Sequence, residues 1–305
     1  MKIAFFGTGE FAVPSLRACA AWIDLVVTQP DRPSGRGLRL RQSPVKRAAL
    51  ELGLTVESPE RSRAPEFVDL VRRHGPDFLL VASYGQILSQ ELLDSARRGG
   101  INLHGSILPE YRGAAPIQRC ILDGRNETGV TLMHMDRGMD TGDVVAVERT
   151  PIGPDETYGE LQDRLAEIAA SMALNFLPAM YRGEASRTAQ DGAHATLAPK
   201  VSKDEAGLRF DRDGRAEYNR FRAFTPSPGA FLTLPGGALR VHAARFQAFS
   251  AEPGTLAQVR PFPIVAFANG ALELREVQPE GKKRMSGTDF ANGARWKVGE
   301  RLGIV

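Results

Sequence analysis

The opening of the chain limits the possible fold more than any other stretch. An apolar run at residues 2–6 leads into the glycine turn 7–9, and a helix-like segment follows at residues 13–22. A strand, a glycine turn and a helix in this order begin a doubly wound α/β sheet. The continuous apolar run at residues 78–82 fits a central parallel strand of such a sheet, buried on both faces.

The same opening raises an alternative function. Gly7, Gly9 and Ala12 have the spacing of a dinucleotide-binding fingerprint, so an NAD-binding oxidoreductase has to be considered. In that class an acidic residue at the end of the second strand binds the ribose. Here Asp31 lies near the expected offset but follows Pro30 in a loop, which makes this alternative the less favoured one.

The pattern changes after a stretch of small and polar residues near position 190. Short alternating runs typical of strands follow, at residues 231–234, 238–246, 255–259, 264–267 and 271–277. Gly236-Gly237 and Asn269-Gly270 predict hairpin turns between them. We therefore expect a Rossmann-like catalytic domain at 1–189, a linker at 190–206, and a small β-barrel domain at 207–305. The barrel would be of the oligonucleotide-binding (OB) type.

Cysteine and histidine usage argues against metal and disulfide chemistry. The 305 residues include two cysteines in unrelated contexts and five histidines without paired ligand spacing. We therefore expect neither a disulfide framework nor a metal site. The sequence shows no signal-peptide pattern and no apolar run near the roughly 20 residues of a membrane helix. We expect a cytoplasmic protein.

Positive charge is concentrated in two places. Residues 200–305 carry 17 Lys and Arg against 11 Asp and Glu, a balance of +6, whereas residues 1–199 carry 22 against 25. The segment 32–47 holds six basic residues, and no acid occurs between Asp31 and Glu51. We interpret this segment as a mobile basic loop, and residues 281–285 as a second basic cluster. Both would contact a polyanion such as RNA.

Three polar residues suggest the chemistry. Asn102 and His104 are two apart in a predicted strand, so their side chains project to the same side. Asp140 lies in the polar turn 136–143, where we assign Asp136 and Asp143 mainly to turn formation. An amide, an imidazole and a carboxylate can take a proton from an amine and stabilise a developing oxyanion.

Six segments together resemble the methionyl-tRNA formyltransferase family over nearly the whole chain. They are QPDRPSGRG at 29–37, SPVK at 43–46, SYGQILS at 83–89, NLHGSILPEYRGAAPIQR at 102–119, MDRGMDTGD at 135–143 and GKKRMS at 281–286. The core of the central segment is shared with other enzymes that use 10-formyltetrahydrofolate. The basic segments are what resemble the tRNA enzyme in particular.

The resemblance implies roles for individual residues. The catalytic residues would be Asn102, His104 and Asp140. Folate would contact Ser83, Tyr84, Gly85, Ser106, Ile107, Leu108, Pro109 and Gly113. The tRNA would contact Arg32, Arg36, Arg39, Arg41, Lys46, Lys282, Lys283 and Arg284, with Arg36 the most important. One departure is visible, because Thr225-Pro226-Ser227-Pro228 stands where the family commonly has an aromatic residue between prolines.

The implied function is formyl transfer from 10-formyltetrahydrofolate to the α-amino group of methionyl initiator tRNA, by a monomer without a metal. A folate-dependent enzyme acting on a small amine or a nucleotide amino sugar would use the same three residues without needing a basic barrel. A non-catalytic RNA-binding protein would explain the basic segments but gives the three residues no joint role. The proton route at His104 and the identity elements of the tRNA stay open at this point.

Overall fold

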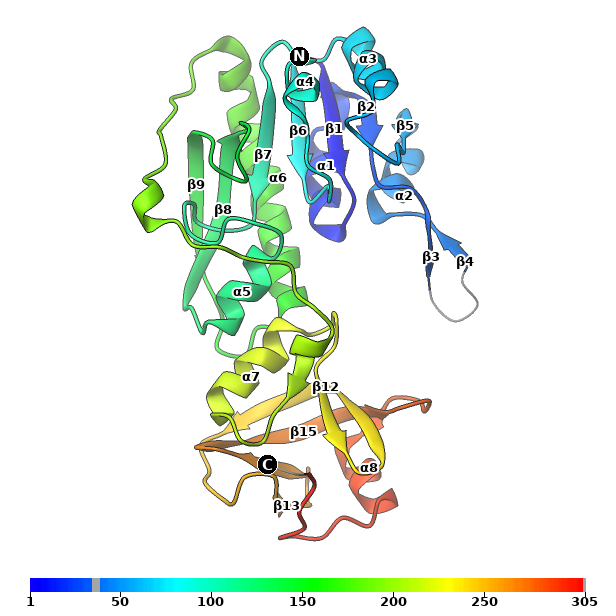
Figure 1. The fold of residues 1–305 in the computed structure, drawn as a ribbon, viewed down its shortest axis with the longest axis vertical. Coiled ribbons are helices and arrows are strands. Elements are labelled where there is room, and N and C mark those ends of the chain that lie inside the picture. The colour runs from blue at the N-terminus through cyan, green and yellow to red at the C-terminus, as the bar shows by residue number, and fades with distance from the viewer. Residues whose placement is uncertain (35–38, 304–305) are drawn as a thin grey trace. The chain divides into compact units, whose positions relative to one another are not determined.

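The computed structural model describes residues 1–34 and 39–303, which form two compact units (Figure 1). The first unit comprises residues 1–116, 127–150 and 162–199, and the second comprises residues 117–126, 151–161 and 200–305. The boundaries that we expect at 189 and 207 remain a prediction.

The first unit is built on a seven-stranded sheet with the order β5-β2-β1-β6-β7-β8-β9. Its strands are β1 (Ile3–Gly7), β2 (Ile23–Val27), β5 (Val56–Glu57), β6 (Phe78–Ala82), β7 (Gly100–His104), β8 (Glu127–His134) and β9 (Val144–Pro151). The strands from β5 to β7 are parallel to their neighbours, and β8 runs antiparallel to β7. The chain runs outward from β1 through β2 to β5, and it then crosses back to place β6 on the other side of β1. This is the doubly wound order expected from the sequence.

Helices lie between these strands in the chain, and the 25-residue helix α6 follows the last strand. They are α1 (Val13–Ala18), α2 (Pro44–Glu51), α3 (Pro65–His74), α4 (Gln90–Leu93), α5 (Pro116–Leu122) and α6 (Tyr158–Arg182), with 3-10 turns η1 (Glu10–Ala12) and η2 (Ala20–Trp22). Local sequence explains several ends: α3 begins at Pro65 and stops at Gly75, which is left-handed with φ 61°. The N-cap of α2 is Ser43, whose hydroxyl accepts the backbone N–H of Lys46.

Burial on both faces of the sheet explains the continuous apolar runs. Phe6 and Leu79 pack on one face with Phe67 and Val71 of α3. Leu80 follows Leu79 in β6 and therefore faces the opposite side of the sheet, and it is equally inaccessible to solvent. The central strands therefore cannot carry the polar alternation of a one-sided sheet, and polar side chains appear where strands end.

The second unit is a small β domain. Its strands are β10 (Gly207–Leu208), β11 (Phe231–Leu234), β12 (Gly237–Gln247), β13 (Leu256–Gln258), β14 (Ile264–Phe267), β15 (Gly270–Pro279) and β16 (Met285–Ser286); its helices are α7 (Gly214–Ala223) and α8 (Gly287–Gly293). The sheet order is β10-β11-β12-β15-β14-β13, with β16 beside β15. Apart from the parallel pair β10–β11, the strands pair antiparallel.

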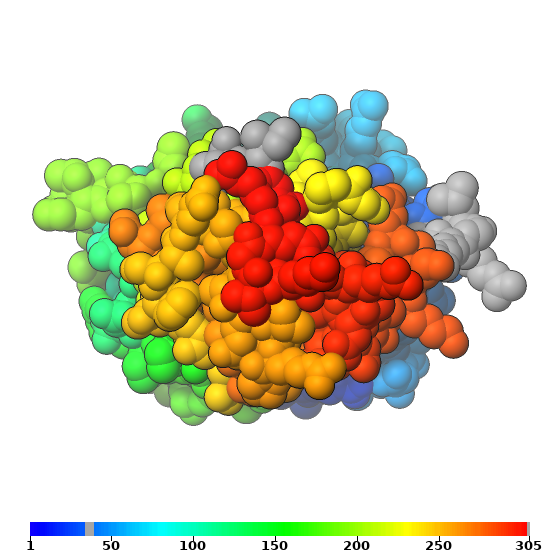
Figure 2. Space-filling model, turned by 90° about the horizontal axis from the view of Figure 1, so that it is seen from below, coloured from blue at the N-terminus to red at the C-terminus, as the bar shows by residue number. Residues whose placement is uncertain are grey.

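Both predicted hairpins are present in this domain. Strands β11 and β12 meet at Leu234 and Gly237, and β14 and β15 meet at Phe267 and Gly270. The turn residue Asn269 has φ 55°, a left-handed conformation that asparagine tolerates, whereas Gly270 already pairs with Phe267 as the first residue of β15. Figure 2 shows in gold, orange and red the surface formed by the later strands and α8. The predicted fold class, a Rossmann-like domain followed by a small β domain, is confirmed.

Two 3-10 turns lie between α6 and the second sheet, η3 (Gly192–His194) and η4 (Asp204–Ala206). The hairpin β3 (Arg32–Ser34) and β4 (Arg39–Arg41) forms a separate two-stranded sheet in the first unit. We interpret residues 32–47 as a mobile basic loop. In the part that the structure describes, residues 32–34 and 39–41 pair as antiparallel strands and α2 begins at Pro44, so the segment is not a loop throughout. Its mobility and its contact with a polyanion remain predictions.

Candidate active site

Strand β7 presents Asn102 and His104 at its carboxyl end. In the register of the sheet Asn102 lies opposite Met133 and His104 lies opposite Thr131 of β8. Both polar side chains are buried, with 9% and 5% of their surface exposed. Because they are two apart on an extended strand, they project to the same side, as predicted. Buried polar groups need partners, and Asp140 and the Tyr111 carbonyl lie next to these two side chains.

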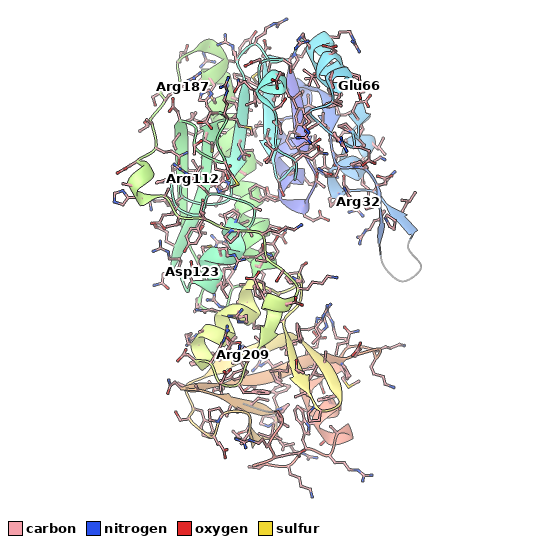
Figure 3. All side chains as sticks on the ribbon, in the orientation of Figure 1. Arg32, Glu66, Arg112, Asp123, Arg187 and Arg209 are labelled. Atoms are coloured by element: carbon pink, nitrogen blue, oxygen red, sulfur yellow. The ribbon has the colours of Figure 1, made fainter. Side chains whose placement is uncertain are left out.

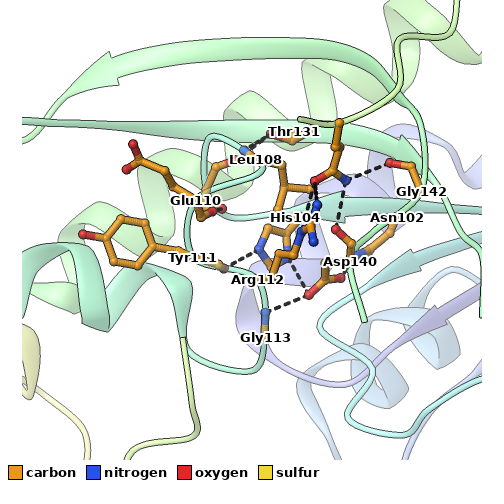
Figure 4. Close-up of polar contacts among 12 residues, drawn as sticks. Asn102, His104, Leu108, Glu110, Tyr111, Arg112, Gly113, Thr131, Asp140 and Gly142 are labelled. Carbon is orange, nitrogen blue, oxygen red and sulfur yellow. Dashed lines mark hydrogen bonds and ion pairs between the residues drawn. The ribbon is translucent and has the colours of Figure 1, made fainter. Parts of the chain in front are cut away.

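Asp140 approaches both residues from the turn 136–143, which connects β8 and β9 (Figure 4). Its Oδ1 accepts a hydrogen bond from Asn102 Nδ2 at 3.3 Å. Its Oδ2 lies 3.7 Å from His104 Nδ1 and accepts the backbone N–H of Gly113 at 2.8 Å. The structure thus brings together the three residues that we predict to be catalytic.

The conformation of Asp140 is unusual for a residue with a side chain. Its φ is 56°, in the left-handed region that a non-glycine residue rarely adopts. Such backbone strain persists where surrounding contacts hold it, and it concentrates at functional sites. Gly142 allows the turn to close, because a Cβ there would lie 2.0 Å from the carbonyl oxygen of His134.

The tautomer of His104 follows from its second contact. Nε2 lies 2.9 Å from the backbone carbonyl oxygen of Tyr111. A carbonyl only accepts, so Nε2 carries a proton and donates it. In the neutral imidazole, Nδ1 then holds the lone pair, and this atom faces the Asp140 carboxylate.

The loop 105–113 is fixed by hydrogen bonds on the side of β8. Ser106 is fully buried and its hydroxyl donates to the carbonyl oxygen of Glu110 at 2.7 Å. Thr131 donates to the Ser106 carbonyl and accepts the N–H of Leu108. Of the folate-contact residues predicted in this loop, Ile107, Pro109 and Gly113 are partly exposed, whereas the side chains of Ser106 and Leu108 are buried.

The predicted folate residues 83–85 differ in their accessibility. Ser83 and Gly85 are exposed and have φ values of 47° and 87°. The Tyr84 ring, 2% exposed, packs edge-to-face on Phe6 with centroids 5.3 Å apart. Burial raises the pKa of the Tyr84 phenol to about 12. Its side chain therefore belongs to the core, and only its backbone borders the segment.

The predicted tRNA contacts in the N-terminal unit fall into three groups. Arg32, labelled in Figure 3, is exposed. Arg41 is also exposed and lies opposite Arg32 in the register of β3 and β4. Arg39 lies in β4, and Arg36 lies outside the described residues. Lys46, in α2, donates to both carboxylate oxygens of Asp31 at 2.9 Å. Asp31 is the acidic residue that would have to bind the ribose in an NAD-binding enzyme, and here its carboxylate is paired with Lys46.

The predicted contacts in the C-terminal unit lie between β15 and β16. Lys282, Lys283 and Arg284 are all exposed. The Arg284 guanidinium pairs with Glu276 at 3.3 Å and lies 2.9 Å from His242 Nδ1. The two lysines extend the positive charge beyond this pair.

The described residues contain no group of three His, Cys, Asp or Glu side chains placed to hold a metal ion. Among the same residues no helix is long and apolar enough to cross a membrane.

Comparison with known proteins decides the family. Residues 1–177 match the formyl transferase family model, and residues 200–295 match the model of the formyl transferase C-terminal domain. The chain belongs to the formyl transferase family. This formyltransferase is 46% identical over 310 residues to the methionyl-tRNA formyltransferase of Sorangium cellulosum, covering 99% of this chain and all of the relative. It is 45% identical to that of Myxococcus xanthus, covering 98% and 97%. The resemblance indicated by the motifs is confirmed.

Solved structures agree with the fold of the formyltransferase. An N-formyltransferase from Helicobacter canadensis, in complex with folinic acid and dTDP-3-aminofucose, aligns with a TM-score of 0.66 at 14% identity. The alignment covers 90% of this chain and 99% of that one. HypX from Aquifex aeolicus in complex with tetrahydrofolic acid aligns with a TM-score of 0.66 at 15% identity, over all of this chain and 51% of that one.

Sequence reasoning missed the residues that hold the site together. Gln190 and Thr196 lie in the stretch that we predict to be a linker, yet both bond to the loops of the site. Arg112 was part of a quoted motif without an assigned role, and its guanidinium binds Gln190. The only available signal was that residues 188–198 show little hydrophobic periodicity. A segment that is held by turns and side-chain hydrogen bonds need not be periodic.

Proposed function

We propose that this formyltransferase moves the formyl group of 10-formyltetrahydrofolate to the α-amino group of methionyl initiator tRNA. The observation that carries the proposal is the arrangement of Asn102, His104 and Asp140 at the end of β7. The name shared by relatives of 41–46% identity over nearly the full chain supports this acceptor.

His104 would manage the proton of the attacking amine. Because Nε2 donates to the Tyr111 carbonyl, Nδ1 is the atom that can accept a proton from the amine, directly or through water. The resulting imidazolium would face the Asp140 carboxylate at the present 3.7 Å separation. Opposite charges at this distance stabilise the protonated ring as the carbon–nitrogen bond forms.

Asn102 would stabilise the oxyanion that develops on the formyl group. Its primary amide has two N–H donors, and one of them is directed to Asp140. The other can donate to the oxygen of a tetrahedral intermediate. A single donor of this kind is typically worth about 3 kcal/mol in the transition state. Collapse of the intermediate would then break the bond between the formyl carbon and N10, and the proton held by His104 would pass to N10, which releases tetrahydrofolate and the formylated amine.

The loop 105–113 and residues 83–85 would bind the folate. The partly exposed Ile107 and Pro109 offer apolar contact to a ring, and the exposed backbone near Ser83 and Gly85 offers polar groups. A mostly apolar wall with a few fixed polar groups is what cofactor-sized ligands require.

Basic residues would bind the tRNA. Arg32 and Arg41 on the hairpin and Lys282 and Lys283 in the second unit are exposed cations on both units. Contacts to phosphates release counterions, so they predict binding that weakens steeply with salt. We assign Lys46 a smaller share, because its ammonium is bound to Asp31. Action as a cytoplasmic monomer remains part of the proposal.

The decisive experiment measures formylation of methionine charged on initiator tRNA, with 10-formyltetrahydrofolate as donor. Uncharged tRNA with free methionine and a nucleotide amino sugar serve as alternative acceptors. We expect transfer to the charged tRNA alone, and a His104→Ala variant that is folded but lacks turnover. Transfer to the amino sugar instead would overturn the proposed acceptor, and normal turnover by the variant would remove His104 from the mechanism.

A further inference from the structure

Residues 188–198, which we name the strap, cross both loops of the active site. At one end Thr188 pairs with Val144, just after the turn 136–143, through reciprocal backbone hydrogen bonds of 2.8 and 2.9 Å. At the other end Leu197 forms a bridge with Arg112 of the loop 105–113. The strap thus joins two segments that are distant in sequence and that each carry a partner of His104.

Gln190 makes four hydrogen bonds across this junction. Its Nε2 donates to the backbone carbonyl oxygens of Asp140 at 2.9 Å and Gly142 at 2.8 Å. Its Oε1 accepts from Arg112 Nε at 3.1 Å and Nη2 at 2.7 Å. A primary amide has two donors and two acceptor lone pairs, so the hydrogen-bonding capacity of Gln190 is fully used.

The bonds from Gln190 fall on the strained part of the turn. Asp140 has φ 56°, and its carbonyl and that of Gly142 flank the peptide units that set this conformation. The carboxylate reaches His104 and the Gly113 N–H only while the turn keeps this shape. A group that binds both carbonyls therefore controls where the carboxylate lies.

The far end of the strap acts on the opposite side of the imidazole. Thr196 Oγ1 accepts the backbone N–H of Tyr111 at 2.8 Å, and the Thr196 carbonyl accepts that of Arg112 at 2.9 Å. The Tyr111 carbonyl is the acceptor for His104 Nε2. Gly113 allows the close approach, because a Cβ there would lie 2.7 Å from the Ala198 carbonyl oxygen.

We propose that the strap positions both ends of the His104 imidazole, with Gln190 acting through Asp140 and Thr196 acting through Tyr111. Both are positioning residues rather than catalytic residues. This role rests on the proposed function, because it requires His104 to handle the proton. Its consequence is that loss of Gln190 should slow chemistry without weakening substrate binding.

Gln190→Ala is the first test, assayed for formylation of methionyl initiator tRNA. We expect kcat to fall about 10- to 100-fold, because a misplacement of about 1 Å in a catalytic group can cost on the order of 100-fold in rate. The KM values for folate and tRNA should stay near those of the parent. Gln190→Glu should lose as much, because its carboxylate still accepts from Arg112 but cannot donate to the two carbonyls. It also provides a second variant if the alanine protein does not fold.

A matched control comes from the same strap. His194 is exposed and its ring pairs with Asp191, so His194→Ala should keep the parent kcat. At the far end, Thr196→Val should lower kcat and Thr196→Ser, which keeps the hydroxyl, should restore it. Circular dichroism and thermal unfolding of each variant separate misfolding from misplacement.

A double-mutant cycle distinguishes positioning from general stability. If Gln190 acts through Asp140, Gln190→Ala should cause little further loss of kcat in an Asp140→Ala background. Losses that multiply, or a Gln190→Ala kcat within about threefold of the parent, would overturn the role of the strap. Should His104→Ala itself retain parent turnover, the proposed catalytic centre is wrong and the strap role falls with it. An inactive His104→Ala beside a fully active Gln190→Ala refutes the strap alone.

Discussion

Replacing Asp140 by Asn removes one negative charge from the centre of the site while keeping the size of the side chain. The Asp140 carboxylate lies 3.7 Å from His104 Nδ1, and the two side chains are 15% and 6% exposed. If the imidazole accepts the amine proton, this charge pair exists in the transition state and not before. The substitution therefore tests a transition-state interaction.

The magnitude follows from the distance. Two full charges 3.7 Å apart attract by about 4.5 kcal/mol at an effective dielectric constant of 20. Proton transfer is incomplete in the transition state, so roughly 2 to 4 kcal/mol should be lost, a decrease of about 30- to 1,000-fold in kcat. The KM for methionyl-tRNA should change little, because the free amine carries no charge that Asp140 would bind.

Single-turnover formylation with saturating folate isolates the chemical step. Asp136→Asn is the matched control, since Asp136 lies in the same turn and its Oδ1 accepts from Gly138 N and Thr141 Oγ1, which an amide oxygen can also do. A rate for Asp140→Asn within about threefold of the parent would refute the charge-pair reasoning. An equal loss in Asp136→Asn would show that the turn, rather than the charge, is responsible.

Three further outcomes are expected. Burial, and to a lesser extent the nearby Arg187, lower the pKa of His134 to about 4 in the folded protein. The same group titrates near pH 6.5 in the unfolded chain, so the free energy of unfolding decreases as the pH falls from about 6.5 to 4. Urea unfolding should show a loss of about 2 kcal/mol by pH 5 that His134→Gln lacks; equal acid sensitivity of both proteins contradicts this. The hydrogen bond from Arg119 lowers the pKa of Glu205 below its ordinary value. Glu205→Gln should therefore lower the free energy of unfolding by roughly 1 kcal/mol at pH 7 and not at all in acid. A difference between variant and parent that does not change with pH would contradict this. Replacing Arg32 and Arg41 by Ala should reduce the salt slope of tRNA binding by about 2, and an unchanged slope would remove the hairpin from the interface.

Local sequence was enough to predict most of the elements. The apolar run 78–82 is β6, and the strand predicted at residues 264–267 is β14. In both cases a short apolar run bounded by turn residues is the dominant signal. Asn102 and His104 were accessible to the same reasoning because the strand period places them on one side.

The basic segment shows where local signals mislead. Six positive charges and two glycines suggested a loop, yet Ser43 caps a helix that begins at Pro44. A serine followed by proline is a helix-start signal, but our prediction gave more weight to the charge composition of the segment. Lys46 illustrates the same limit, since its partner Asp31 is fifteen residues away and only the fold brings them together.

The contacts of residues 188–198 could not be predicted from the sequence for a more general reason. A segment with little hydrophobic periodicity is expected to be solvated, because periodicity records the burial of side chains against a core. The strap is held mainly by backbone hydrogen bonds and by the amide of Gln190, and these leave no period in the sequence. The imidazole of His104 therefore depends on four separate segments, namely β7, the loop 105–113, the turn 136–143 and the strap. Sequence motifs identified the first three because their side chains carry the chemistry. The fourth carries none, and it became visible only through the hydrogen bonds that it makes with the loop 105–113 and the turn 136–143.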